Sequence, residues 1–308
     1  MEMELGPETV DTPHPVLDKC DYFTDVQLWP ASDILDSQGW LTNFRDNELP
    51  YAIRLLDFFM YFSERVVDAL LYSAFQRLSS VSPDHSGPMT GLEWRSFVDT
   101  ALLTYVTGED PNVTDSGFTF ARKARQVLGV SEGNVVAPDA ALQRLLQAPR
   151  PVVFVDDFVG SGSQCIRTWL RPYPAFANST RSFADIAQLT TSKFYYCPVV
   201  STAAGMRNVR RYCHGLHLAP AHVLDGRYSV LSAKSLAWDS ATRQHAIDVV
   251  RKASQRAGIP DTRGRDVNDW QGFHKLGLAI AFHNSVPDAT IPLFHWANNG
   301  WIPLVRRR

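Results

Sequence analysis

The chain has 308 residues, of which 45% are apolar and 20% are charged, and its formal net charge is −2 at pH 7. This composition describes a folded protein that can bury a sizeable core rather than a disordered chain, and the net charge argues neither for nor against a nucleic-acid partner. No signal peptide or bilayer-long apolar run occurs and the four cysteines lack Cys-x-x-Cys spacing, so we expect a cytoplasmic protein with reduced thiols.

The first 90 residues divide into two segments of different character. Residues 1–35 are rich in acids and prolines without periodicity, which predicts an extended acidic arm. Residues 36–90 predict a helical segment, dominated by one amphipathic helix over residues 52–78. Apolar residues recur there at spacings of three and four, with no glycine or proline between them, so one stripe should pack against a core.

Residues 91–308 alternate between strand-like and helix-like stretches, and from about residue 270 they become irregular and rich in aromatic residues, proline and glycine. The alternation predicts an α/β domain, compact with residues 36–90, whose sheet is mostly parallel and doubly wound. The irregular C-terminal segment predicts a cover folded over this sheet. The expected strands are 102–106, one starting at 152, 194–200, 216–224 and 278–282, and the expected helices are 116–128, 139–147, 203–212 and 241–257.

The segment from Pro151 to Gln164, PVVFVDDFVGSGSQ, carries the strongest functional signal. A buried apolar strand ends in two adjacent carboxylates, Asp156 and Asp157, and a loop of small residues then leads into a helix. Open α/β folds place ligands at this edge of the sheet, where small residues and a helix N-terminus favour an anion. The carboxylates suit sugar hydroxyls, or a divalent ion that the hydroxyls or a pyrophosphate also touch. The pattern therefore predicts a ribose 5-phosphate site.

Of two other interpretations of this segment, one remains open and one is excluded. A purely structural strand with an acidic end remains an alternative. The acidic strand of a P-loop nucleotide hydrolase is excluded, because that class needs a Gly-x-x-x-x-Gly-Lys-Ser/Thr loop and the sequence contains none.

The segment resembles the phosphoribosyl diphosphate signature of type I phosphoribosyltransferases, which consists of hydrophobic residues, Asp-Asp, two variable residues and a Thr/Ser-Thr/Ser-Gly loop. The resemblance implies an α/β fold of that kind, with Asp156 and Asp157 as the catalytic pair that holds the ribose 2′- and 3′-hydroxyls and contacts Mg²⁺ indirectly. The sequence departs from the pattern at two loop positions, where a glycine and a glutamine replace threonine or serine. The loop residues implied to bind substrate are Val159, Gly160, Ser161, Gly162, Ser163 and Gln164.

A second loop holds the pyrophosphate in this family, and residues 107–117 are placed for that role. The helix N-terminus at Ser116 and Gly117, with Asp115 beside it, could contact the substrate, and Arg122 could neutralise the pyrophosphate. A solvated basic helix face is an equal alternative for Arg122. Three acids crowd the loop, which suits a metal or a hydroxyl-rich substrate better than a pure phosphate cradle.

Three stretches, 40–44, 108–117 and the aromatic C-terminal segment, give a narrower resemblance, to the phosphoribosyltransferase-like effectors of bacterial conflict systems, including retron-associated antiphage cassettes. It implies an effector that acts on a phosphoribosyl or nucleotide substrate, as a glycosyltransferase or a hydrolase of the nucleotide N-glycosidic bond. Implied partners are a reverse transcriptase, its retron DNA and a DNA-binding protein, with no membrane. The alternative is a non-catalytic sensor of a phosphoribosyl ligand that regulates a protein or nucleic-acid partner.

Overall fold

The computed structural model describes residues 15–81, 87–108, 116–175 and 179–306. The chain forms two compact units, one made of residues 1–63 and 235–308 and the other of residues 64–234. The first and last segments of the chain therefore build one unit together, and the middle segment builds the other. This division differs from the expected boundaries, which joined residues 36–90 and the C-terminal cover to the α/β domain.

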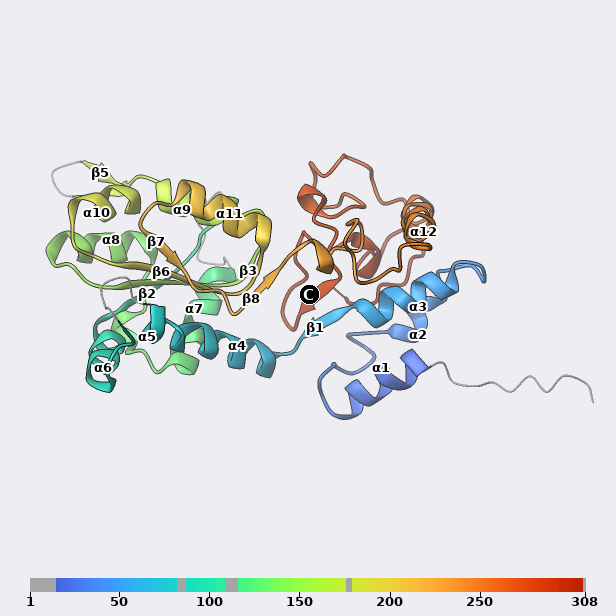
Figure 1. The fold of residues 1–308 in the computed structure, drawn as a ribbon, viewed down its shortest axis with the longest axis horizontal. Coiled ribbons are helices and arrows are strands. Elements are labelled where there is room, and N and C mark those ends of the chain that lie inside the picture. The colour runs from blue at the N-terminus through green and yellow to red at the C-terminus, as the bar shows by residue number, and fades with distance from the viewer. Residues whose placement is uncertain (1–14, 82–86, 109–115, 176–178, 307–308) are drawn as a thin grey trace, which may run out of the picture. The chain divides into compact units, whose positions relative to one another are not determined.

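A five-stranded parallel sheet forms the centre of the second unit (Figure 1). Its strands follow the order β2, β3, β6 and β7, and β8 pairs with the second half of β6. All of these pairs run parallel, which confirms the predicted α/β fold with a mostly parallel sheet. The strands are β2 (Leu102–Tyr105), β3 (Val152–Val159), β6 (Phe194–Thr202), β7 (Leu216–Leu218) and β8 (His222–Leu224).

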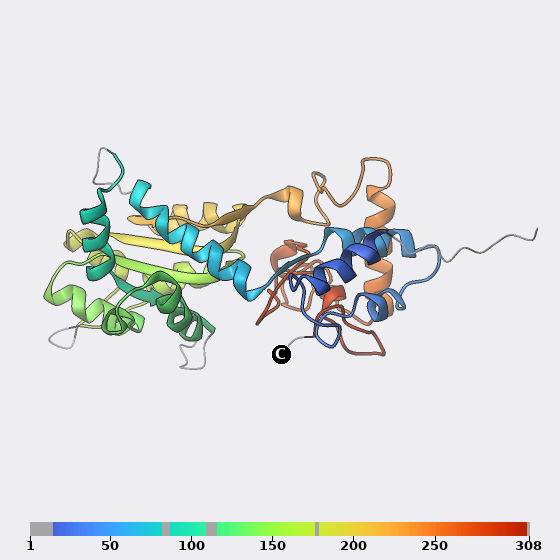
Figure 2. The same ribbon diagram turned by 90° about the horizontal axis from the view of Figure 1, so that it is seen from below.

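Helices cover both faces of this sheet. Helices α8 to α11 lie on one face, and α4 and α7 lie on the other, where α4 packs against β6 and α7 against β2 and β3; Figure 2 shows α4 crossing the strands. Every residue of β6 is buried, as are the first four residues of β3, which is typical of parallel strands covered on both faces. The helices of this unit are α4 (Glu64–Gln76), α5 (Leu78–Val81), α6 (Gly91–Thr100), α7 (Ser116–Leu128), α8 (Pro138–Gln147), α9 (Ser163–Leu170), α10 (Phe183–Leu189) and α11 (Ala203–Tyr212), and a small antiparallel pair joins β4 (Tyr173–Pro174) to β5 (Thr180–Arg181).

An aromatic core lies between the sheet and helices α8 to α11. The ring centroid of Trp169 in α9 lies 5.1 Å from that of Phe194 in β6 and 6.3 Å from that of Phe183 in α10. All three side chains are buried, and burial of such large apolar rings fixes α9 on the sheet. The position of α9 matters for function because this helix begins directly after the loop that follows β3.

The single helix predicted over residues 52–78 is wrong, because a strand interrupts it. This strand pairs in parallel with a distant segment, β9, and Phe62 stacks on Phe282 of β9 with ring centroids 5.0 Å apart. Such long-range pairing overrides the local helical period. Leu55 consequently belongs to the first unit and Val67 to the second. The four elements are α3 (Leu49–Phe58), β1 (Met60–Phe62), α4 and α5, and the partner strand is β9 (Ile280–Phe282).

The first unit is built around aromatic residues from both ends of the chain. The ring centroid of Trp40 lies 4.8 Å from that of Phe44 and 5.4 Å from that of Phe294, on which the Trp40 ring stacks. Trp40 Nε1 donates to the Leu293 carbonyl at 2.8 Å. The aromatic C-terminal segment therefore belongs to the core of this unit, which corrects the expectation of a cover belonging to the α/β domain. Residues 15–25 are helical where an extended arm was expected. The helices of this unit are α1 (Pro15–Asp25), α2 (Ser37–Leu41), α3 and α12 (Arg243–Arg256).

All four cysteines are buried and free of disulfide bonds. Within the described ranges, none of the helices has the length and apolar character needed to cross a lipid bilayer.

Candidate functional site

The acidic pair lies in β3, which runs between β2 and β6 in the sheet. The sequence predicts both carboxylates at the end of the strand, but β3 continues, with Phe158 and Val159 still paired to β6. Asp156 and Asp157 are half-buried. Instead of projecting freely toward solvent, Asp156 contacts the neighbouring strand, because the Tyr196 hydroxyl on β6 donates a hydrogen bond to Asp156 Oδ2 at 2.6 Å.

Burial is the main influence on the ionisation of Asp156. It raises the pKa of this carboxyl well above its usual range, and the nearby charge of Asp157 raises the pKa further. Hydrogen bonds from Tyr196 and from the Asp157 backbone act in the opposite direction. Burial and the charge of Asp156 raise the pKa of Tyr196 as well, so the phenol keeps its proton and remains the donor. Because each carboxylate raises the free energy of charging the other, Asp156 and Asp157 form a pair that resists carrying two negative charges.

The loop from Gly160 to Gly162 turns the chain from β3 into α9. Gly162 has a φ of 81°, in the left-handed region that favours glycine, and it caps the N-terminus of α9. The Ser161 and Ser163 hydroxyl oxygens lie 2.8 Å apart at this turn. Because α9 begins at Ser163, its first N–H groups and the positive end of its dipole face the loop. This arrangement is suited to an anion.

Helix α11 holds this loop from the side. The Thr202 hydroxyl donates to the Gly160 carbonyl at 2.5 Å and accepts from the Gly205 N–H at 2.9 Å. Asn208 Nδ2 donates to the Ser161 carbonyl at 2.9 Å. The peptide bonds of this loop are trans, so each N–H points opposite to the carbonyl before it. Since these two carbonyls point at α11, the next two N–H groups along the loop point away from α11, as a backbone anion site requires.

Replacing Gly205 by alanine is expected to disturb this loop. A Cβ at this position would lie 2.4 Å from the Gly160 carbonyl oxygen and 3.0 Å from Val159 Cγ1. We expect Gly205→Ala to destabilise the second unit by about 1–3 kcal/mol and to weaken phosphate binding, as measured by thermal melting and calorimetry. The matched control is Gly133→Ala, where a Cβ would meet nothing within 4 Å. An unchanged melting temperature and phosphate affinity in Gly205→Ala would show that the loop does not depend on this contact.

The predicted second loop is only partly described. Asp115, with the rest of residues 109–115, lies outside the described residues, so its role stays a prediction. Helix α7 begins at Ser116, as the sequence predicts. A Cβ on Gly117 would lie 2.6 Å from the Val106 carbonyl oxygen, so glycine lets α7 begin close against the end of β2. The N-terminus of α7 thus lies beside the carboxyl end of β2.

The start of this second loop is tied to α9. The Thr107 N–H donates to Thr168 Oγ1 at 3.0 Å, and both threonines are buried. Arg171 donates from Nη1 to Thr107 Oγ1 at 2.6 Å and from Nη2 to the Gly108 carbonyl at 2.7 Å. Helix α9 therefore connects the two loops, because its N-terminus follows the first and its C-terminal end holds the second.

Arg122 lies on the exposed side of α7, with its guanidinium carbon 5.9 Å from the centre of the Phe118 ring. The neighbouring Lys123 is paired with Glu64 at 2.9 Å and Asp68 at 3.1 Å on α4. Helix α7 covers the face of the sheet opposite to that of α9, whereas the contact between Asp156 and Tyr196 lies on the α9 face. The pyrophosphate role of Arg122 stays a prediction, and the solvated basic face remains the alternative.

The structure adds three side chains that sequence reasoning missed, namely Tyr196, Thr202 and Asn208. Thr202 had a detectable signal, because threonine directly before a predicted helix is a favoured N-cap. Tyr196 had none, since a tyrosine in an apolar strand is expected to pack as an aromatic ring. Of the remaining predicted loop residues, Val159 is buried and Gln164 is exposed.

The donor set at the site does not suit a metal ion held by the protein alone. Among the described residues, no three His, Cys, Asp or Glu side chains form a group that could hold a metal. Mg²⁺ takes an octahedral set of oxygen ligands, whereas the site offers two carboxyls, one of them engaged by Tyr196. The indirect contact of Mg²⁺ through ribose hydroxyls or pyrophosphate stays a prediction.

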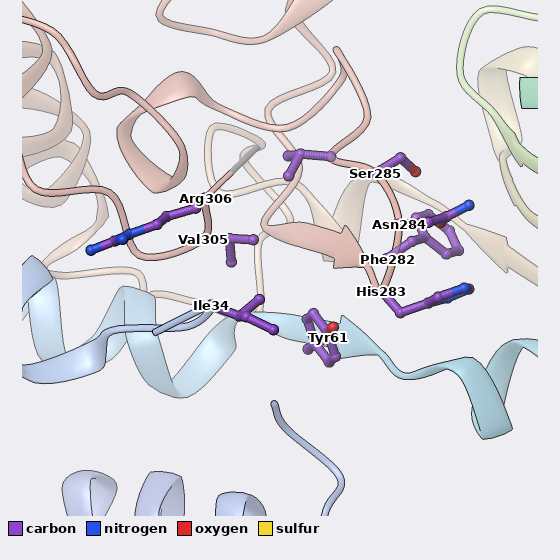
Figure 3. A pocket seen from close by; sticks show the side chains of 9 residues that line it. Ile34, Tyr61, Phe282, His283, Asn284, Ser285, Val305 and Arg306 are labelled. Carbon is purple, nitrogen blue, oxygen red and sulfur yellow. The ribbon is translucent and has the colours of Figure 1, made fainter. Parts of the chain in front are cut away.

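A cavity in the first unit lies where β1 and β9 end (Figure 3). Its volume is about 10 Å³, room for about one water molecule. Figure 3 shows the Arg306 side chain extending away from those of His283 and Asn284, so these polar groups do not converge. This cavity is too small for a sugar phosphate. The cavity is lined by Ile34, Tyr61, Phe282, His283, Asn284, Ser285, Val286, Val305 and Arg306.

The sheet is parallel, and its central strand carries an acidic pair and leads through a small-residue loop into a helix. This arrangement is that of a type I phosphoribosyltransferase-like protein. The PRTase-CE family model matches residues 37–307. Because this match spans most of the chain, the chain belongs to the PRTase-CE family. Family membership indicates a phosphoribosyltransferase-type function, which is glycosyltransferase chemistry at the level of enzyme class.

Two solved structures are similar to the chain at low sequence identity. Orotate phosphoribosyltransferase from Aeropyrum pernix is 12% identical, with 52% of this chain and 69% of that chain covered and a TM-score of 0.27. The AQ2163 protein from Aquifex aeolicus is 11% identical, with 68% of this chain and 92% of that chain covered and a TM-score of 0.30. At these TM-scores neither carries an argument about the site. No curated protein matches the chain.

Proposed function

We propose that the protein binds a phosphoribosyl or nucleotide substrate at the loop between β3 and α9 and breaks the bond at ribose C1. The observation that carries the proposal is the loop itself. Its carbonyls at Gly160 and Ser161 are held by α11, so its N–H groups point away from that helix, and α9 adds the positive end of its dipole. A 5-phosphate bound there would set the ribose beside Asp156 and Asp157 on β3.

In such a reaction C1 of the ribose gains oxocarbenium character. The bond from C1 to pyrophosphate or to a base breaks, and its electron pair leaves with the departing group. A base nitrogen or a water oxygen then forms the new bond to C1, and the proton that it loses passes to the departing pyrophosphate or base. The part of the chain is to position the sugar: the loop holds the 5-phosphate and the acidic pair accepts hydrogen bonds from the ribose hydroxyls. A base as acceptor makes the protein a transferase, and water makes it an N-glycosidic hydrolase.

The proposed biological role is that of an effector in bacterial antiviral defence. Its support is the resemblance of the chain to the effectors of bacterial conflict systems. The same resemblance favours a reverse transcriptase, its retron DNA or a DNA-binding protein as the partner that controls the activity. An effector of this kind is expected to alter the nucleotide pool of cells that express it.

A second candidate is a sensor that binds a phosphoribosyl ligand without turning it over. Two observations on Asp156 favour the sensor. Tyr196 already engages this carboxyl, and the raised pKa of Asp156 makes the carboxyl a weaker charged acceptor for a ribose hydroxyl. Gly160 and Gln164, which depart from the family pattern, favour it as well.

Product analysis separates these candidates. The purified chain is incubated with phosphoribosyl diphosphate or with a mixture of nucleotides, with and without Mg²⁺, and released pyrophosphate, free base and ribose phosphate are measured. An enzyme is expected to release at least one of these products, and the release should disappear in Asp156→Asn, Asp157→Asn. A sensor is expected to give a calorimetric binding signal with no product. The proposal fails if wild-type protein neither binds nor turns over any of these compounds.

A further inference from the structure

The hydrogen bond between Tyr196 and Asp156 joins two groups that are costly to bury. Tyr196 is 1% exposed, and its ring belongs to the apolar core that also contains Phe154, Cys165 and Val209. A buried phenol hydroxyl needs a hydrogen-bond partner. The half-buried carboxyl of Asp156 needs a partner even more, because removing a charge from water costs more than removing a neutral hydroxyl. Apolar side chains at both positions would avoid these costs.

The strand register explains how the two groups meet. Phe154 on β3 pairs with Tyr196 on β6, and Asp156 pairs with Pro198. Side chains two residues apart on a strand share a face, so Phe154 and Asp156 point to the face on which the Tyr196 ring is buried. The tyrosine hydroxyl therefore reaches along the sheet toward its carboxyl edge and meets Asp156 Oδ2 from the core side.

We propose that Tyr196 is a positioning residue, which holds one carboxyl oxygen of Asp156 on the core side so that the other is presented to a ribose hydroxyl. The inference rests on the proposed function, because Tyr196 acts only through a sugar bound beside β3. It divides recognition into two parts. The loop of residues 160–163 recognises the phosphate, and the Tyr196–Asp156 pair recognises the sugar.

Two probes separate these parts in calorimetric titrations of the full chain. Inorganic phosphate engages only the loop, whereas ribose 5-phosphate engages the loop and the acidic pair. Tyr196→Phe is expected to lower the affinity for ribose 5-phosphate about tenfold, which corresponds to one hydrogen bond, and to leave the affinity for inorganic phosphate unchanged. Asp156→Ala is expected to lose affinity for ribose 5-phosphate as well, and in that background Tyr196→Phe should have no further effect.

Two further variants serve as controls. Tyr195→Phe makes the same chemical change at the neighbouring residue of β6, which packs against Phe97 with ring centroids 5.4 Å apart, and it should leave both affinities unchanged. Asp156→Asn has a single side-chain oxygen, which the phenol would engage, so Tyr196→Phe should not lower the affinity further in that background.

Three results would overturn the inference. Equal ribose 5-phosphate affinity in wild type and Tyr196→Phe would remove the positioning role while the proposed function stands. Equal losses for both probes, together with a lower melting temperature, would show that Tyr196 only supports the core. An absence of ribose 5-phosphate binding to the wild-type chain would defeat the proposed function and the inference together.

Discussion

The double variant Asp156→Asn, Asp157→Asn is expected to fold and to lose at least about 100-fold in affinity for ribose 5-phosphate, because hydrogen bonds from two ribose hydroxyls to ionisable acceptors are weakened together. An amide offers a single oxygen and no negative charge to these hydroxyls. Affinity for inorganic phosphate should stay near that of wild type, because the loop of residues 160–163 is unchanged. Calorimetric titration with both ligands measures the two effects in the same samples.

The same variant is expected to be more stable than wild type at neutral pH. The pKa of Asp156 is raised in the folded protein, so the unfolded chain loses this proton first as the pH rises. Asp156 therefore lowers the stability of wild type progressively from about pH 4, where an ordinary aspartate ionises, up through its folded pKa. The double variant lacks this penalty and the repulsion between the carboxylates. Its advantage in melting temperature should be small near pH 4 and larger at pH 7.

Asp99→Asn is the matched control for charge, since Asp99 is an exposed acid in the same unit. It should leave the ligand affinities unchanged. A double variant that retains full ribose 5-phosphate affinity would show that the acidic pair is structural.

Leu71→Asp is expected to unfold the second unit. Leu71 is fully buried on α4, at 0% exposure, and α4 packs against β6 in the middle of the parallel sheet. An aspartate there would be buried without a partner, at a cost of several kcal/mol, which is a large share of the stability of a domain. Thermal melting and limited proteolysis between residues 64 and 234 would detect the loss.

Tyr72→Asp is a close control, because the adjacent Tyr72 is 50% exposed. It introduces the same charge one residue further along α4 and should leave melting nearly unchanged. If Leu71→Asp melted like wild type, α4 would not be part of the core of this unit.

The parallel sheet could be predicted from the sequence because its signals are local. Strand β3 and helices α7 and α11 follow from apolar runs and helical periods that end at recognisable boundaries. The break between α3 and α4 could not be predicted in this way. The stretch from residue 59 to residue 63 continues the apolar spacing of a helix, and only its pairing with β9, from the far end of the sequence, makes it a strand.

The candidate site was predictable in part for the same reason. The order of strand, acidic pair, small-residue loop and helix is contiguous, so Asp156 to Ser163 could be identified together. Tyr196 and Asn208 act on that segment across the fold, and their contacts depend on strand register and on how α11 packs. The extension of β3 beyond the acidic pair follows from its pairing with β6, which the sequence of β3 alone does not encode.

A crystal structure of the full chain with ribose 5-phosphate tests the central claim most directly. We expect the phosphate to lie within hydrogen-bond distance of the backbone N–H groups of Ser161 and Gly162, on the side of the loop that faces away from α11. The ribose hydroxyls should contact Asp156 or Asp157, with the hydrogen bond between Tyr196 and Asp156 retained. A phosphate bound elsewhere on the chain, with the loop after β3 left without ligand, would contradict the assignment of this loop as a phosphoribosyl site.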